Sequence, residues 1–262
     1  MELDLNKSFN GYRAYIMDTG AFADDGIYGR CLDAVSEYRR CKVERLRRRD
    51  DRNASLAAGI LFAHALRECA GIDERLVTYE KNKAGKPFIK DIQFSISHTE
   101  GCVAAAIGSE PCGIDVERVR RIPDSIVNRL YSDEDKKCVM SCAHPEIYST
   151  CVWTRREAYS KMTGTGILMK DEEQQMVMDN AHMEKKNIWL GNYAVCRAEC
   201  DGRMHMDEIA DPAHVEGDMN IDFIAAFCAA SDGTFSPDIK MIDSADIVCY
   251  YVSVSYTHLT LP

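Results

Sequence analysis

Residues 94–117 read FSISHTEGCVAAAIGSEPCGIDVE, and the interpretation of the chain starts from this stretch. It opens with a short alternating run that ends in Ser97 and His98. The apolar run Val103–Ile107 follows, and turn residues then lead into the strand-like segment Ile114–Glu117. The pattern predicts three consecutive β-strands.

The third of these strands carries two carboxylates on one face. Side chains alternate along a strand, so Asp115 and Glu117 point one way while Ile114 and Val116 point the other. Neighbouring carboxylates raise each other's pKa unless a cation lies between them. Oxygen ligands of this kind suit Mg²⁺, which takes one or two carboxylates, several waters and substrate phosphate oxygens. The alternative is an ordinary pair of solvent-facing strand residues.

A second stretch, WTRREAYSK at residues 153–161, adds a third carboxylate. Trp153, Glu157 and Lys161 are four residues apart, so they form one stripe on a helix. Glu157 and Lys161 could form a surface salt bridge, and Trp153 is expected to pack in the core at the start of the helix. The stripe could equally complete the site that the strand begins.

The order of these motifs resembles the 4′-phosphopantetheinyl transferases, in particular the larger Sfp type. The shared blocks are G-K-P at 85–87, F-x-I-S-H at 94–98, G-I-D-x-E at 113–117 and W-x-x-(K/R)-E-x-x-x-K at 153–161. The resemblance covers about residues 36–165, and residues beyond about 170 match only loosely. It implies two similar α+β halves that form an intramolecular pseudo-dimer, with the site between them.

The resemblance assigns roles to the carboxylates and to the cations beside them. It implies that Asp115, Glu117 and Glu157 bind Mg²⁺, with Mn²⁺ as the alternative ion. Glu157 is also the candidate catalytic base, acting directly or through a metal-bound water. Lys161 matches the phosphate-binding lysine. Arg156 stands where many relatives carry lysine, so the charge is kept with a different donor geometry.

The resemblance also implies a coenzyme A site that begins in the first half of the chain. His98 matches a residue that contacts the phosphates of coenzyme A, and Ser97 beside it assists. Lys86 and Pro87 match a turn that lies beside the adenine.

A local basic segment runs from Arg39 to Arg52. On an acidic protein, such a patch suits a small polyanionic ligand better than a long polyanion. Arg39, Lys42 and Ser55 fall near family positions that hold the 3′-phosphate of coenzyme A. Arg39 and Ser55 depart from the family in residue type, and a solvated helix face is the alternative for each residue.

Composition limits the classes of function. The net charge of −10 argues against nucleic-acid binding. No apolar run approaches the ~20 residues of a membrane-spanning helix. The first residues lack a basic region followed by an apolar core, so no signal peptide is predicted and a cytoplasmic protein is expected. Twelve cysteines without a C-x-x-C pair are interpreted as reduced, mostly buried thiols.

The hydrophobic pattern predicts an α+β fold with an N-terminal half at residues 1–110 and a C-terminal half at 111–262. Helices are expected over 29–49 (broken near Cys41), 53–69 and 145–163, and later strands over 188–200, 221–229 and 247–255. Residues 203–217 show no clear pattern. The final SYTHLTLP is a strand end or a non-native extension, and carries no functional assignment.

The function implied by the resemblance is transfer of the 4′-phosphopantetheine group of coenzyme A to a serine of an apo acyl or peptidyl carrier protein. The released product is 3′,5′-ADP, and the enzyme is expected to work as a monomer. The pathway served by the carrier (fatty acid, polyketide or nonribosomal peptide) stays open. The alternatives are a coenzyme A-binding regulatory module and a Mg²⁺-dependent phosphodiesterase.

Overall fold

The computed structural model describes residues 11–81, 87–166, 188–197, 203–215, 221–230 and 238–258. The helices and strands of these residues confirm the predicted α+β class. The chain divides into two compact units. The first unit combines Met1–Ser109 with Asp238–Pro262, and the second is Glu110–Pro237. Within the described residues, no helix has the length and apolar character needed to cross a membrane.

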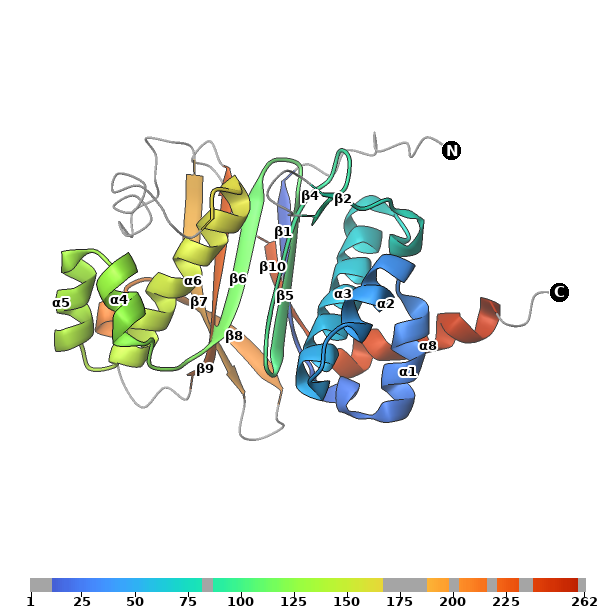
Figure 1. Ribbon diagram of the computed structural model, residues 1–262, viewed down its shortest axis with the longest axis horizontal. Coiled ribbons are helices and arrows are strands. Elements are labelled where there is room, and N and C mark those ends of the chain that lie inside the picture. Colours follow the sequence, from blue (N-terminus) through green and yellow to red (C-terminus); the bar gives the residue numbers. More distant parts are fainter. Residues whose placement is uncertain are drawn as a thin grey trace. The chain divides into compact units, whose positions relative to one another are not determined.

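The first unit is a four-stranded sheet with helices packed against it (Figure 1). In the order β10-β1-β5-β4, the strand β5 (Cys102–Gly108) is antiparallel to both β1 (Tyr12–Asp18) and β4 (Gln93–Thr99). The helix α3 (Arg49–Ala70) buries its Ala- and Leu-rich face against these strands and forms most of the core. The remaining elements are α1 (Asp25–Ala34), α2 (Glu37–Glu44), β2 (Glu80–Lys81), β3 (Pro87–Phe88), β10 (Asp238–Ile242), α8 (Ser244–His258) and the short 3-10 turns η1 (Gly20–Ala23) and η2 (Glu74–Leu76).

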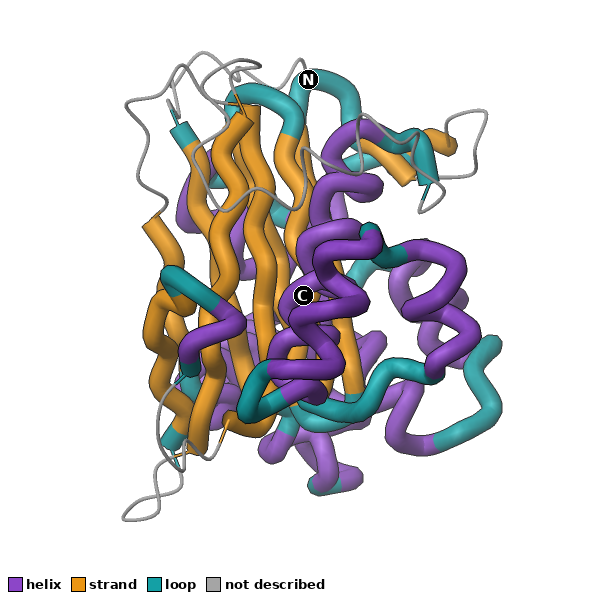
Figure 2. Tube along the Cα trace, turned by 90° about the vertical axis from the view of Figure 1, so that its left-hand side faces the viewer, coloured by secondary structure: helices purple, strands orange, loops and turns teal. Residues whose placement is uncertain are grey.

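The second unit has its own four-stranded antiparallel sheet, in the order β6-β9-β7-β8. Figure 2 draws the strands of the described residues in orange, and the strands of each sheet run alongside one another. The long helix α6 packs on β6 and β9. The elements are β6 (Cys112–Arg118), α4 (Asp124–Leu130), α5 (Asp133–Ser141), α6 (Pro145–Thr163), β7 (Ile188–Arg197), β8 (Met204–Ile209), the turn η4 (Pro212–His214) and β9 (Ile221–Ala230).

The two units share one topology, although no sequence repeat is visible. Each begins with a strand, continues through three helices of which the third is longest, and returns through further strands. In each sheet the last of the shared strands lies between the other two, giving β1-β5-β4 in one unit and β6-β9-β7 in the other. The first unit adds β10 beside β1, and the second adds β8 beside β7. The two similar halves are therefore present in the backbone topology.

The end of the chain differs from its prediction. Residues from Asp238 onward were assigned to the C-terminal half, but β10 pairs in parallel with β1 of the first unit. The strand predicted over 247–255 is wrong, because α8 spans this region. Ile247, Val248 and Tyr251 are buried in the first unit's core, and their spacing is that of one helical face. Branched residues at this spacing imitate a strand in the sequence.

Three other predictions also need correction. The break in the helices over 29–49 lies at Val35–Ser36 and not near Cys41, because Ser36 caps α2 by accepting from the backbone N–H of Arg39. The helix predicted from Asn53 begins one turn earlier, at Arg49. Residues 203–217 contain β8, whose mostly polar side chains at the sheet edge gave no apolar alternation.

A close backbone contact fixes α6 on β6. Gly113 of β6 faces the main chain of α6, and a Cβ atom at this glycine would lie 1.9 Å from the carbonyl oxygen of Ala158 and 2.8 Å from the nitrogen of Met162. Real Cβ atoms do not approach backbone this closely, so only glycine permits the observed spacing of helix and strand.

Replacing Gly113 by alanine should therefore push α6 off β6. We expect a loss of stability at or above the upper end of the range of about 1–3 kcal/mol that is typical of overpacking, because the obstructing atoms belong to the backbone. The measurement is thermal unfolding of Gly113→Ala, with Gly29→Ala in α1 as the matched control. Nothing lies within 4 Å of a Cβ at Gly29, and alanine favours a helix interior. A melting temperature of Gly113→Ala equal to that of the control would contradict the contact.

Candidate functional site

The predicted carboxylates and lysine come together on β6 and α6. Asp115 is buried, and its Oδ1 accepts a hydrogen bond from Nζ of Lys161 at 2.6 Å. Glu117 follows on the same face of β6, and Glu157 precedes Lys161 by one turn of α6. The strand and helix periodicities thus place three carboxylates and one cation in the same part of the second unit.

The carboxylates interact electrically. Burial, and then the charge of Asp115, raise the pKa of both Glu117 and Glu157 above the ordinary value of a glutamate. The charge of Lys161 acts in the opposite direction on each. Because the ionised forms of both glutamates are disfavoured beside the charge of Asp115, the cluster favours the approach of a cation. Lys161 supplies one such charge from within the chain.

Glu117 also has one hydrogen-bond donor and one ion-pair partner that sequence reasoning did not assign. Nε1 of Trp153 donates to its Oε1 at 3.3 Å, and Nη2 of Arg120 lies 3.9 Å from its Oε2. Trp153 was predicted to be core packing, and it does pack beside the buried residues under α4. Its four-residue spacing from Glu157 was the available signal for a second role. Arg120 follows β6 in an irregular segment, where no sequence signal indicates a partner.

Arg156 occupies a different face of α6. It is 1% exposed, and its burial lowers the pKa of its guanidinium, against the favourable influence of Tyr131 and Asp135. Its Nε and Nη1 have no hydrogen-bond partner among the described residues. Successive helix residues are about 100° apart, so Arg156 and Glu157 point in different directions. A phosphate contact by Arg156 stays a prediction.

Arg39 is buried in the first unit and has protein partners of its own. Its Nε lies 3.9 Å from Oε1 of Glu74, and its guanidinium packs over the rings of Phe62 and Tyr79. Glu74 is 2% exposed, and it also accepts hydrogen bonds from the backbone and hydroxyl of Ser36 and from the hydroxyl of Tyr79. These contacts tie the start of α2 to the segment after α3.

Lys42 and Ser55 differ in their accessibility. Lys42 is exposed near the end of α2, yet partial desolvation and the charge of Arg39 lower the pKa of its ammonium group. Ser55 is buried in α3. Lys42 is therefore the most accessible of the three residues predicted to contact the 3′-phosphate.

The remaining predicted residues lie on or beside β4. Ser97 is buried and pairs across the sheet with Ala104 of β5, while His98 is exposed. Pro87 begins the short strand β3, and Lys86 lies outside the described residues. All of these residues belong to the first unit, whereas the carboxylate cluster belongs to the second.

Two features of the second unit bear on ligands. In the described part of the chain, no group of three or more His, Cys, Asp and Glu side chains converges closely enough to hold a metal ion as the side chains stand.

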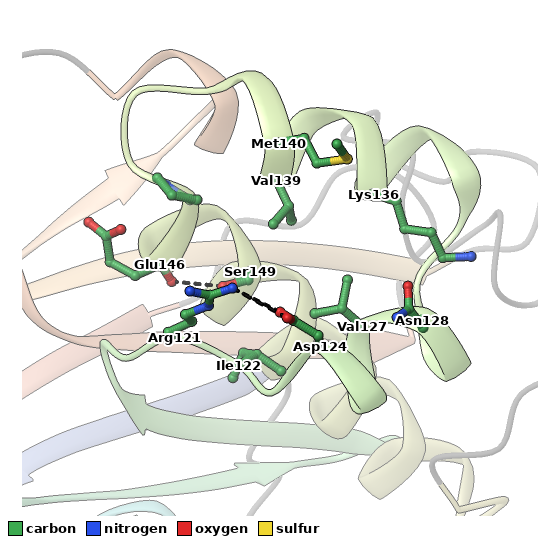
Figure 3. A pocket seen from close by; sticks show the side chains of 11 residues that line it. Arg121, Ile122, Asp124, Val127, Asn128, Lys136, Val139, Met140, Glu146 and Ser149 are labelled. Atoms are coloured by element: carbon green, nitrogen blue, oxygen red, sulfur yellow. Dashed lines mark hydrogen bonds and ion pairs between the residues drawn. The ribbon is translucent and has the colours of Figure 1, made fainter.

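A cavity of 530 Å³ lies between α4, α5 and the start of α6 (Figure 3). Ile122, Val127 and Val139 contribute its apolar lining, and Arg121 pairs with Asp124 at its edge. None of the predicted site residues lines it.

Comparison with known proteins matches both parts of the chain. A model of the 4′-phosphopantetheinyl transferase superfamily matches residues 111–201, and a model of the N-terminal part of 4′-phosphopantetheinyl transferases matches residues 27–110. The first match contains the whole carboxylate cluster, and the second contains the basic helix α2.

Curated relatives agree at modest identity. The 4′-phosphopantetheinyl transferase psf-1 of Bacillus pumilus is 30% identical over 138 residues, which cover 51% of this chain and 59% of that protein. A 4′-phosphopantetheinyl transferase of Bacillus subtilis is 27% identical over 165 residues, covering 60% of this chain and 73% of the relative. The transferase Sfp of Bacillus subtilis strain 168 is 26% identical over 143 residues, with coverage of 53% and 64%.

The predicted motifs, the cluster that they form and both family models agree, and the chain belongs to the 4′-phosphopantetheinyl transferase superfamily.

Proposed function

We propose that this protein transfers the 4′-phosphopantetheine group of coenzyme A to a serine hydroxyl of an apo acyl or peptidyl carrier protein, releasing 3′,5′-ADP. The observation that carries the proposal is the cluster of Asp115, Glu117, Glu157 and Lys161 in a member of this superfamily. The relatives' names describe the same transferase. The proposed setting is a monomer in the cytoplasm.

The reaction sets three requirements that these residues can meet. The serine oxygen forms a bond to phosphorus, the bond from phosphorus to the oxygen of the 3′,5′-ADP group breaks, and the hydroxyl proton must be accepted. Glu157 is the base we assign, because it matches the family's helix carboxylate and lies on α6 one turn before Lys161 in the same cluster. Lys161 can neutralise a phosphate oxygen when the substrate competes with Asp115 for its ammonium group.

The donor set is suited to Mg²⁺. Asp115, Glu117 and Glu157 would supply the hard oxygen ligands that this ion prefers, and the ion would relieve the repulsion that raises the pKa of both glutamates. Their present side-chain positions do not form a closed ligand group. When bound, the ion would neutralise charge on the pyrophosphate of coenzyme A.

Coenzyme A recognition is proposed for residues of the first unit. Lys42 and His98 are exposed and would contact ligand phosphates, and Ser97 lies beside His98 on β4. Pro87 and Lys86 would lie beside the adenine. Arg39 is expected to stabilise the fold around Lys42 without contacting the ligand, because its charge is already paired with Glu74.

The proposal is tested by incubating an apo carrier protein with coenzyme A, Mg²⁺ and this protein, followed by intact-mass spectrometry of the carrier. A mass increase equal to one phosphopantetheine group supports the transfer. Coenzyme A binding without a change in carrier mass would favour a regulatory module. Hydrolysis of coenzyme A without a carrier adduct would favour a phosphodiesterase.

Glu157→Gln should reduce turnover by roughly 10²–10⁴-fold, the usual contribution of a positioned base. Added Mg²⁺ should not restore the full rate, because the amide cannot accept the proton. Folding should be kept. The raised pKa means that the ionised form of Glu157 costs stability in the folded state above that pKa, so the neutral amide should give a melting temperature at pH 8 at or above the wild-type value. A folded variant with near-wild-type turnover would remove Glu157 from the mechanism.

Asp115→Ala should instead weaken metal binding. Removing one ligand lowers the affinity for Mg²⁺, so a higher Mg²⁺ concentration should recover part of the rate. Lys161 is partly exposed, so it can turn to solvent when its partner is removed. The measurement is the transfer rate across a Mg²⁺ titration, with circular dichroism as the control of folding. Full activity at limiting Mg²⁺ would mean that Asp115 does not serve the metal site.

Lys42→Ala and Arg39→Ala should behave differently, although both residues were predicted to contact the 3′-phosphate. Lys42→Ala should weaken coenzyme A by roughly ten- to a hundredfold and dephospho-coenzyme A much less, since a contact to a charged group is worth about 1.5–3 kcal/mol. Arg39→Ala leaves the buried Glu74 without its cation, so about 3–5 kcal/mol of stability should be lost. Calorimetry with both ligands and thermal unfolding separate the two effects. Equal weakening of the two ligands by Lys42→Ala would contradict the phosphate contact.

A further inference from the structure

Glu117 is held at both of its oxygens by groups that belong to no predicted site. The indole Nε1 of Trp153 donates to Oε1 at 3.3 Å, and Nη2 of Arg120 lies 3.9 Å from Oε2. Glu117 is partly buried beside the buried Asp115, whose charge repels it. A glutamate side chain in this position can lower its energy by turning toward water, unless donors hold it in place.

Packing fixes the first of these donors. Trp153 lies in α6 one turn before Glu157. It packs against a cluster of buried side chains formed by Ile122, Val127, Leu130, Tyr131 and Val152. An indole has few rotatable bonds and donates only through its nitrogen. Packing of the ring therefore fixes the direction of the N–H group that reaches Glu117.

The ion-pair partner, Arg120, is tied to the same helix. Oγ1 of Thr150 accepts from the backbone N–H of Arg120 at 3.4 Å and lies 3.2 Å from the carbonyl oxygen of Arg120. Thr150 is completely buried in α6. This link holds the segment after β6 against α6 and brings the exposed Arg120 side chain within reach of Glu117.

We infer that Trp153 is a positioning residue for Glu117, with Arg120 as the weaker second support, and that it holds the carboxylate in the orientation needed for the proposed metal site. The expected effect on metal binding rests on the proposed function, whereas the hydrogen bond from Trp153 to Glu117 does not. Ring packing alone would not require the indole nitrogen to face a carboxylate. Groups that orient metal ligands in this way typically contribute 10–100-fold to metal affinity.

The hydrogen bond itself is tested by NMR spectroscopy of the full-length, ¹⁵N-labelled protein. The chain has two tryptophans, so two indole N–H resonances are expected. Trp189→Phe, in β7, identifies the resonance of Trp153. We expect Glu117→Gln to move the Trp153 resonance and to leave the Trp189 resonance in place. A Trp153 resonance that does not move in folded Glu117→Gln would overturn the inference.

The consequence is tested with Mn²⁺ alone as the probe, by electron paramagnetic resonance and without substrates. Trp153→Phe keeps an aromatic ring and removes the N–H donor, while Trp189→Phe is the matched control. We expect roughly tenfold weaker Mn²⁺ binding for Trp153→Phe, wild-type binding for the control, and a transfer rate that recovers at saturating metal. A merely structural role would lower the melting temperature without this recovery.

The outcomes separate the inference from the proposed function. Equal Mn²⁺ affinity of the two variants, or absence of Mn²⁺ binding by the wild type, would overturn the positioning role even if the wild type modifies a carrier protein. Absence of carrier modification by the wild type would instead contradict the proposed function, while a moved Trp153 resonance together with weaker Mn²⁺ binding of Trp153→Phe would still support the positioning role.

Discussion

The candidate site depends on the direct contact between α6 and β6. Gly113 has no side chain, so the carbonyl oxygen of Ala158 can lie where a Cβ atom would otherwise be. This spacing brings the helix stripe of Glu157 and Lys161 close to the strand face of Asp115, close enough for a 2.6 Å bond between Lys161 and Asp115. A helix one side-chain layer farther away would leave the carboxylates of strand and helix as separate surface groups.

Three carboxylates lie near this contact, and their mutual repulsion lowers the stability of the fold. Asp115 is almost fully buried, and its charge adds to the effect of burial in raising the pKa of both neighbouring glutamates. The protein offsets this repulsion with groups of its own: Lys161 at Asp115, and Trp153 with Arg120 at Glu117. A site that holds repelling carboxylates beside a lysine which can change partners is prepared for a cation and for an anionic substrate, as the proposed phosphoryl chemistry requires.

The first unit uses its charges in another way. Buried Glu74 accepts from Ser36 and Tyr79 and pairs with Arg39, so a cation that the sequence places in a basic patch is part of the interior. Lys42, one turn later, is exposed. The two units also share one strand and helix order without visible sequence similarity. The same backbone plan therefore carries a buried charge network in one unit and a cluster of carboxylates in the other.

Elements whose signals are local could be predicted from the amino-acid sequence. The Ala-rich pattern of α3 and the alternation along β6 were enough to predict the α+β class. Local spacing placed Asp115 and Glu117 on one strand face and Glu157 on a helix stripe with Lys161, and the family resemblance gave these residues their proposed roles. Features that depend on residues distant in the chain became visible when the fold was known. Ile247, Val248 and Tyr251 are buried in the core of the first unit, so the last described segment is a helix of that unit. Arg39 is buried because it pairs with the buried Glu74. The hydrogen bond from Trp153 to Glu117 joins residues 36 positions apart, and periodicity cannot report such a contact because it describes only the face on which a side chain lies.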